Sequence, residues 1–354
     1  MTVERIHQKL HERAPALGSK LDELSIGRIW RSAKTYREHP LVPMFRSLVQ
    51  DEIDMSVLHK TSEAIRQLGL RPEHGEWLSS RLERCLQIDD FSSSASALGE
   101  LRAGGALLQG GFQVHPIAEN RNPTCDFQIS CNGLDAYVEV ATKQMSGKTV
   151  DYLNSSSDSR ERSICPGGAP DPNKDGETIG ENAGHKFASI KPKAKQVSHG
   201  SVALLWVDVQ DEDWWPADIT HTKPVVSFNG EFYSGGIWHG FYGSAGTPLF
   251  EKQSTEERIK REQYTQSYPG LFSQHDLWSA AVLSFRNGTV VFEHPSPANS
   301  MPEDLVKQLL ALPGADYSDW WIRWPSAQSN ALNERIQRTF NELRSLAEVA
   351  GFSW

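Results

Sequence analysis

Hydrophobic residues recur at helical spacing through the first quarter of the chain. Because positions three and four apart lie on one side of a helix, this spacing predicts amphipathic helices. Arg71-Pro72 ends the pattern, since proline cannot continue a helix. The apolar positions are Leu41, Met44, Phe45, Leu48, Val49, Val57, Leu58, Ile65, Leu68 and Leu70.

One more helix is predicted directly after this region. The serines at positions 92 to 94 offer N-cap hydroxyl groups, and leucines then recur at helical spacing. Gly110-Gly111 is a typical stop, because glycine readily adopts the positive φ that ends many helices.

Three strands are predicted next. The first is short and covers residues 112–116, and the other two cover residues 125–130 and 134–143. Asn132-Gly133 joins the last two, and both residues tolerate the positive φ that a tight hairpin turn requires. We expect these two strands to pair as an antiparallel hairpin.

The rest of the chain alternates between an irregular segment and further regular elements. Residues 145–183 contain mainly Ser, Gly, Asp, Asn and Pro without an apolar period, so they predict a long loop. A basic stretch over 185–199 and an apolar strand over 202–209 follow. A second hairpin is predicted across Asn287-Gly288, and an amphipathic helix over 332–346 closes the chain.

This order of elements predicts an α/β fold in which helices flank one mixed central sheet. We divide the chain into three parts. An N-terminal helical region covers residues 1–90, and the core covers 91–295 with its long loop. A C-terminal helical region over 296–354 is expected to pack on the core.

Composition indicates the general class of protein. A hydrophobic fraction of 38% with 23% charged residues is typical of a globular protein with a sizeable core. No apolar run approaches the roughly 18 to 20 residues needed to span a bilayer, and the first residues lack the apolar core of a secretory signal. The four cysteines are irregularly spaced, which favours neither a CxxC pair nor a disulfide framework. We therefore expect a cytoplasmic protein without membrane contact.

The net charge of −9 argues against a protein that coats nucleic acid, because such proteins hold phosphates with an overall basic surface. It does not argue against a nuclease. An enzyme requires only a local basic cleft, and metal-binding carboxylates themselves add negative charge.

Three acidic residues stand out in the core. Glu100 lies on the predicted helix, Asp126 at the start of the second strand and Glu139 inside the third. Paired strands lie under about 5 Å apart, so carboxylates on the two hairpin strands can share a cation. Mg²⁺ takes oxygen ligands, often one or two protein carboxylates, and a bound metal can activate water and neutralise charge on a phosphate. The pattern favours a metal site for phosphodiester hydrolysis.

The helix acid Glu100 is followed by Pro123-Thr124-Cys125-Asp126 and then by Tyr137-Val138-Glu139-Val140. This order resembles the PD-(D/E)xK nuclease superfamily over, at most, residues 92–210. The resemblance implies a restriction-endonuclease-like sheet, with Asp126 and Glu139 as ligands of Mg²⁺ or Mn²⁺ and Glu100 assisting through a bound water. It also implies cleavage of DNA or RNA and a role in bacterial restriction or antiviral defence.

One position departs from the superfamily's pattern, which has a lysine two residues after the glutamate. This chain has Ala141 there. Strand alternation places Glu139, Ala141 and Lys143 on one face, with Lys143 about 6.6 Å further along the strand. Because a lysine stem is flexible, we predict that Lys143 replaces the missing ammonium group. Lys186 and Lys193 are rival positions.

Four lysines of the basic stretch are candidates for contacts with phosphate groups: Lys186, Lys191, Lys193 and Lys195. A solvated helix face is an equally good interpretation of them. We expect nucleic acid as the partner, with DNA favoured over RNA. A homodimer and a separate partner subunit are both compatible with the sequence.

Two other motifs fit their patterns poorly. Gly147-Lys148-Thr149 ends like a phosphate-binding loop, but Thr142 stands where the first glycine is required. Ser244 has Tyr242 two places before it, where a nucleophile elbow needs glycine. The main alternative to a nuclease is a catalytically inactive subunit that binds nucleic acid or an assembly partner, which the alanine at position 141 keeps open.

Overall fold

The computed structural model describes residues 2–32, 39–50, 55–118, 124–143, 179–191, 200–210, 219–223, 225–228, 231–246, 248–255 and 258–316. Lys193, Lys195 and the helix predicted over residues 332–346 lie outside these ranges, as does the greater part of the loop predicted over 145–183.

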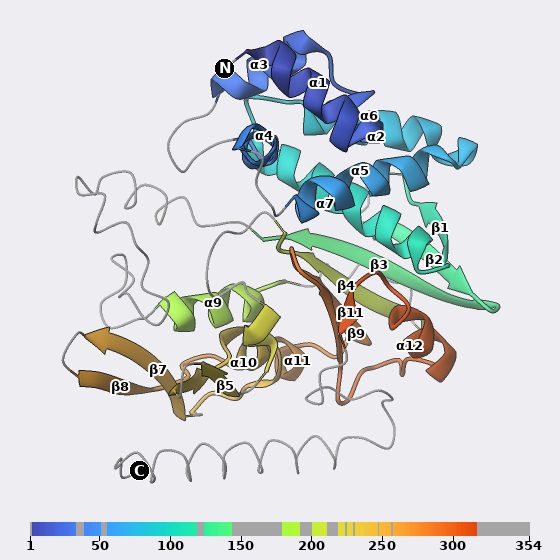
Figure 1. Cartoon of the computed structure of the whole chain (residues 1–354). Coiled ribbons are helices and arrows are strands. Elements are labelled where there is room, and N and C mark those ends of the chain that lie inside the picture. Colours follow the sequence, from blue (N-terminus) through green and yellow to red (C-terminus); the bar gives the residue numbers. More distant parts are fainter. Residues whose placement is uncertain are drawn as a thin grey trace.

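Three layers build the described part of the chain, with the main sheet in the middle (Figure 1). The N-terminal helices cover one face of the sheet, and a smaller group of helices lies on the other side. The predicted α/β class, with helices flanking a mixed sheet, is confirmed.

The N-terminal region is helical, as predicted. Its elements are α1 (Val3–Arg13), α2 (Pro15–Gly18), α3 (Glu23–Ser32), α4 (Leu41–Gln50), α5 (Ser56–Gly69), a 3-10 turn (Pro72–His74) and α6 (Gly75–Cys85). Most of the predicted apolar positions are buried in one cluster. Leu70 is 61% exposed, because it stands two residues after the buried Leu68 and so points away from the buried face of α5.

Helix α7 (Phe91–Gln109) joins the N-terminal helices to the sheet. Its N-cap is Asp90 rather than a serine, since the Asp90 carboxylate accepts a 3.0 Å hydrogen bond from Ser93 N–H. A Cβ on Gly105 would overlap the main chain of Ala64 in α5, so glycine permits the close approach of the two helices. Helix α7 shares apolar residues with both hydrophobic clusters of the molecule.

The main sheet has seven strands in the order β1-β2-β3-β4-β9-β10-β11. Strands β1 to β3 form an antiparallel meander, whereas β3, β4 and β9 run parallel. Strand β10 is antiparallel to β9, and β11 is parallel to β10. The strands are β1 (Gln113–Pro116), β2 (Phe127–Cys131), β3 (Leu134–Thr142), β4 (Val202–Asp208), β9 (Ala280–Ser284), β10 (Thr289–Glu293) and β11 (Ala315–Asp316).

The two predicted hairpins form with different turns. Asn132 and Gly133 adopt φ of 52° and 77°, which confirms the tight turn between β2 and β3. Between β9 and β10, Phe285 N–H donates to Gly288 O at 2.8 Å. Neither Asn287 nor Gly288 has a positive φ, so this turn is of another type.

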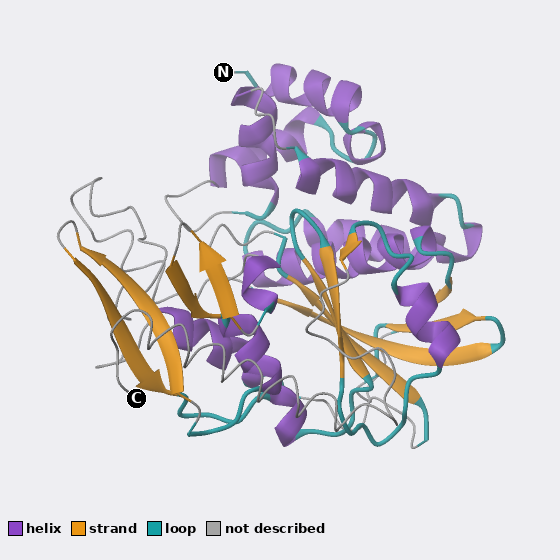
Figure 2. Cartoon of the chain, turned by 60° about the horizontal axis from the view of Figure 1, so that its bottom comes forward, coloured by secondary structure: helices purple, strands orange, loops and turns teal. Residues whose placement is uncertain are grey.

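The second helical layer contains α9 (Ile179–Ala188), α10 (Gly236–Tyr242) and α11 (Leu271–Gln274). Helix α9 begins inside the segment predicted as a loop, which corrects that prediction for residues 179–183. Two small hairpins lie apart from the main sheet (Figure 2). They are β5 (Val225–Phe228) with β6 (Glu231–Ser234), and β7 (Pro248–Thr255) with β8 (Arg258–Thr265).

The segment after residue 295 is not purely helical. It contains α12 (Glu303–Leu309), but residues 315–316 form β11 and extend the sheet. Across the described ranges, no helix combines the length and the apolar character needed to cross a bilayer. The three described cysteines, Cys85, Cys125 and Cys131, are buried and are not joined in disulfides.

Candidate active site

A β-bulge shapes the main chain at Asp126. Its N–H donates to Val138 O at 3.0 Å, although Val138 is already the registered partner of Phe127. Asp126, directly before β2, and Phe127, its first residue, therefore both stand opposite Val138 of β3, the arrangement that defines a bulge. On the other side, Asp126 O accepts from Ile117 N–H at 2.9 Å, which fixes the bulge between β1 and β3.

The bulge directs the Asp126 carboxylate toward β3. Asp126 Oδ2 accepts a 2.7 Å hydrogen bond from Val140 N–H, and the side chain is half-buried. Val140 is the residue directly after Glu139. The predicted neighbours Asp126 and Glu139 are thus brought to adjacent positions of two paired strands.

Glu139 belongs to the sheet face that the second helical layer covers. Strand register aligns Glu139 with Leu205, Ala281 and Phe292 in one row across the sheet, and registered partners share a face. The Phe292 ring packs against Phe241 of α10, with the ring centres 5.2 Å apart. Glu139 is only 7% exposed, so its carboxylate lies at the border of the interior.

Lys143 extends the pairing of β3 by one residue. Its N–H donates to Asp208 O of β4 at 2.9 Å, and its side chain is half-buried. Because the pairing continues, strand alternation places Lys143 on the same face as Glu139.

Glu100 is held elsewhere. Its carboxylate forms a buried ion pair with Arg81 of α6, lies 3.9 Å from Arg84 Nη1 and accepts a 3.5 Å hydrogen bond from Ser96. Helix α7 covers the opposite sheet face, since a Cβ on Gly99 would overlap the side chain of Thr142. Glu100 is therefore engaged by arginines on the side of α7, whereas Glu139 lies on the opposite face of the sheet, and the predicted assistance of Glu100 at a metal site stays a prediction.

The predicted phosphate-contacting lysines are described only in part. Lys186 is half-buried in the last turn of α9, and Lys191 is exposed just beyond that helix. Lys193 and Lys195 lie outside the described residues, so the predicted basic patch is represented here by its first two members.

A polar row that the sequence reading missed crosses the α7 face at the carboxyl ends of the parallel strands. Thr142, Asp208, Ser284 and Thr289 are registered partners on four neighbouring strands. Two features of the sequence could have indicated this row. One is an arginine inside a helix of Ala, Gly and Leu, and the other is an aspartate at the end of an apolar strand.

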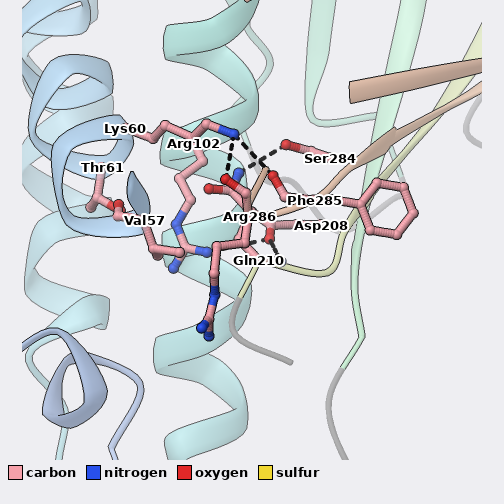
Figure 3. Close-up of polar contacts among 9 residues, drawn as sticks. All are labelled: Val57, Lys60, Thr61, Arg102, Asp208, Gln210, Ser284, Phe285 and Arg286. Carbon is pink, nitrogen blue, oxygen red and sulfur yellow. Dashed lines mark hydrogen bonds and ion pairs between the residues drawn. The ribbon is translucent and has the colours of Figure 1, made fainter. Parts of the chain in front are cut away.

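The arginine in question, Arg102 of α7, pairs with Asp208 (Figure 3). Arg102 Nη1 lies 3.3 Å from Asp208 Oδ1, and the two side chains are 1% and 0% exposed. Gln210 adds a 3.0 Å hydrogen bond from its N–H to the same Asp208 oxygen, and its side-chain amide donates to Ser284 at 2.8 Å. An ion pair this deep ties α7 to the sheet.

Lys60 of α5 makes a further link beside this row. Its ammonium group donates to the carbonyl oxygens of Phe285 and Arg286, both at 3.0 Å (Figure 3). A shallow cleft lies next to it, and Met44, Gln210 and Arg286 are among the residues of its wall. This cleft adjoins the polar row and not Glu139.

Within the described ranges, no group of three or more His, Cys, Asp and Glu side chains has the geometry of a metal site. Asp126 and Glu139 are two carboxylates, the number that a protein commonly supplies to Mg²⁺. Comparison with family models, with curated proteins and with solved structures finds no match to this chain.

Proposed function

We propose that this chain is a metal-dependent nuclease in which Asp126 and Glu139 hold a Mg²⁺ or Mn²⁺ ion. The observation that carries the proposal is the hydrogen bond from Val140 N–H to Asp126 Oδ2. It holds one carboxylate beside the strand position that bears the other. Lys143 would contact the attacking water or the scissile phosphate from the same face.

The order of elements also supports the proposal. Helix α7 is followed by the antiparallel strands β1, β2 and β3, then by α9, and then by β4 parallel to β3. This is the succession of elements that the resemblance to PD-(D/E)xK nucleases implies for residues 92–210. DNA is the substrate that we favour, with a role in restriction or antiviral defence.

The donor set fits a hard divalent cation. Two carboxylate side chains offer oxygen ligands and leave further coordination positions for water and phosphate, as Mg²⁺ sites commonly do. When bound, such an ion would lower the pKa of a water molecule and neutralise charge on the phosphate. Because Glu139 is nearly buried, a cation at this position would also offset the cost of removing its charge from water.

The ammonium group of Lys143 would stabilise charge electrostatically and would not transfer a proton. A cation beside the phosphate stabilises negative charge that develops as the phosphodiester is attacked, and this effect is strong where water is partly excluded. Half-burial of the side chain is consistent with such a position.

A cleavage assay tests the proposal. Supercoiled plasmid, single-stranded DNA and RNA are incubated with the full chain in Mg²⁺ or Mn²⁺ and in EDTA. Asp126→Asn keeps an acceptor for Val140 N–H while removing the charge, and Glu139→Gln is its counterpart on β3. Asp135→Asn is the matched control, because Asp135 is an exposed acid of the same strand.

Metal-dependent cleavage by the wild type and by Asp135→Asn, with loss in both site variants, would support the nuclease. Cleavage that survives both site variants would refute the assigned site. Binding of these nucleic acids without cleavage in either metal would favour the inactive binding subunit, the alternative that Ala141 and the engagement of Glu100 by Arg81 support.

A further inference from the structure

Two histidines face each other on the first helix, far in sequence from the proposed nuclease site. His7 and His11 are one turn apart on α1, and their Nε2 atoms are 3.1 Å apart. Residues four apart lie on one side of a helix, so both imidazoles project from the same face of α1. His7 is half-buried and His11 is exposed, so both rings can be reached from solvent.

We propose that His7 and His11 form a binding site for a divalent late transition-metal ion of the Zn²⁺ class. The separation of their nitrogens fits such an ion. An ion 2.0–2.1 Å from each nitrogen, the usual Zn–N distance, would subtend an angle of about 95–102° between them. This angle lies between the roughly 90° of octahedral and the roughly 109° of tetrahedral coordination.

The orientation of the two rings separates metal binding from a simple hydrogen bond. Rings in a straight N–H···N bond would have centres about 5.4 Å apart, because each nitrogen lies about 1.15 Å from its ring centre. Rings whose lone pairs converge on one ion would have centres about 4.8 Å apart. The observed distance is 4.7 Å, with the ring planes at 80°. This separation is shorter than a straight hydrogen bond would give and is close to the value for two rings that converge on one ion.

Glu23, the first residue of α3, completes the arrangement. Its Oε1 lies 3.6 Å from Nδ1 of His7, the ring nitrogen that does not face His11. A carboxylate at this position favours a proton on Nδ1 and leaves the Nε2 lone pair for a metal, as the outer partners of metal-bound histidines commonly do. Glu23 is therefore a positioning residue, and it links α3 to the site.

The chemistry of this pair differs from that of Asp126 and Glu139. Imidazole nitrogen suits Zn²⁺, Ni²⁺ and Cu²⁺, whereas carboxylate oxygen suits Mg²⁺ and Mn²⁺. Two imidazoles leave the other coordination positions to water, so the bound ion is exposed. The site is independent of the proposed nuclease function, and failure of either proposal leaves the other standing.

Calorimetric titration of the full chain with ZnCl₂ tests the site, with far-UV circular dichroism to confirm that each variant is folded. The variants are His11→Gln, which removes one ligand, and Glu23→Gln, which removes the orienting charge. His59→Gln is the matched control, because His59 is an exposed histidine on another helix. An Asp126→Asn/Glu139→Gln double variant removes the carboxylate site.

We expect one Zn²⁺ bound by the wild type, by His59→Gln and by the double variant. His11→Gln should weaken binding at least tenfold, and Glu23→Gln should weaken it by about tenfold, the lower end of the effect of such outer partners. Unchanged Zn²⁺ affinity in His11→Gln would overturn the proposal. Loss of all Zn²⁺ binding in the double variant would overturn it as well, because it would place the ion at the carboxylates.

Discussion

Glu100 of α7 and Glu139 of β3 lie on opposite faces of the central sheet. Thr142, three residues after Glu139, points toward α7, where a Cβ on Gly99 would overlap it. Since successive strand residues alternate between faces, Glu139 points the other way, toward the layer of α10. The two glutamates that the sequence groups together therefore have different environments.

Glu100→Gln should reduce stability and leave metal binding intact. The substitution leaves the buried guanidinium of Arg81 without its charged partner, so we expect a loss of about 3–5 kcal/mol in the free energy of unfolding. Urea denaturation measures it. Glu63→Gln is the control, since Glu63 pairs with Arg66 at the surface, where solvent screens the pair, and its loss should matter far less. Equal effects of the two substitutions would contradict a structural role for Glu100.

Gly105→Ala should destabilise the joint between α5 and α7. A methyl group at position 105 would overlap the main chain of Ala64, and main chain cannot rotate away as a side chain can. We expect a loss of about 1–3 kcal/mol, despite the better helix propensity of alanine. Gly75→Ala is the control, because nothing lies within 4 Å of a Cβ at that helical position. Gly75→Ala should leave the melting temperature unchanged or raise it slightly. An equal drop in melting temperature in both variants would exclude the overlap with Ala64 as the cause.

His294 should make stability depend on pH. Burial is the main cause that lowers its pKa below the usual 6.5. In addition, Nδ1 accepts a 2.9 Å hydrogen bond from Ser296 N–H, while Nε2 lies 2.9 Å from the carbonyl oxygen of His275. The folded chain thus holds the neutral ring.

Because the folded pKa is the lower one, the unfolded chain binds the proton first as the pH falls. The stability from this group is present above about pH 6.5 and is lost as the pH falls through the folded pKa. His294→Asn should flatten the change in unfolding free energy between pH 7.5 and 5.5, whereas His59→Asn should not. If the unfolding free energy of His294→Asn changes with pH as steeply as that of the wild type, other groups cause the pH dependence.

Lys143→Ala should lower the cleavage rate without affecting metal binding. Loss of a cation that stabilises charge in the transition state typically reduces kcat by about 10²–10³. The rate is measured on whichever substrate of the panel the wild type cleaves, with Lys223→Ala, an exposed lysine, as control. If Lys186→Ala lowers the rate and Lys143→Ala does not, the ammonium group comes from α9 instead.

Local signals predicted the sheet well. The Asn132-Gly133 turn, the glycine stop after α7 and the three strands around Asp126 all follow from residues close in sequence. These features depend on backbone preferences of a few residues, which a sequence states directly. The cap of α7 was assigned to a serine because Asp90 and the serines are both good N-caps and stand side by side.

Long-range features did not follow from the sequence. That Glu100 faces Arg81 depends on how α6 packs on α7, and the bulge at Asp126 depends on pairing with two strands at once. The Arg102–Asp208 pair joins residues 106 positions apart. The sequence shows that Arg102 and Asp208 are charged residues in apolar surroundings. It does not show that they form an ion pair, because tertiary packing brings them together.

Binding of Mn²⁺ tests the central claim most directly, because it requires no knowledge of the substrate. Free Mn²⁺ is followed by electron paramagnetic resonance as the ion is titrated into the full chain. We predict that the wild type and Asp135→Asn bind one ion at a site that Mg²⁺ competes for, and that Asp126→Asn and Glu139→Gln each lose it. Wild-type Mn²⁺ binding in the Asp126→Asn/Glu139→Gln double variant would contradict a metal site at these two carboxylates.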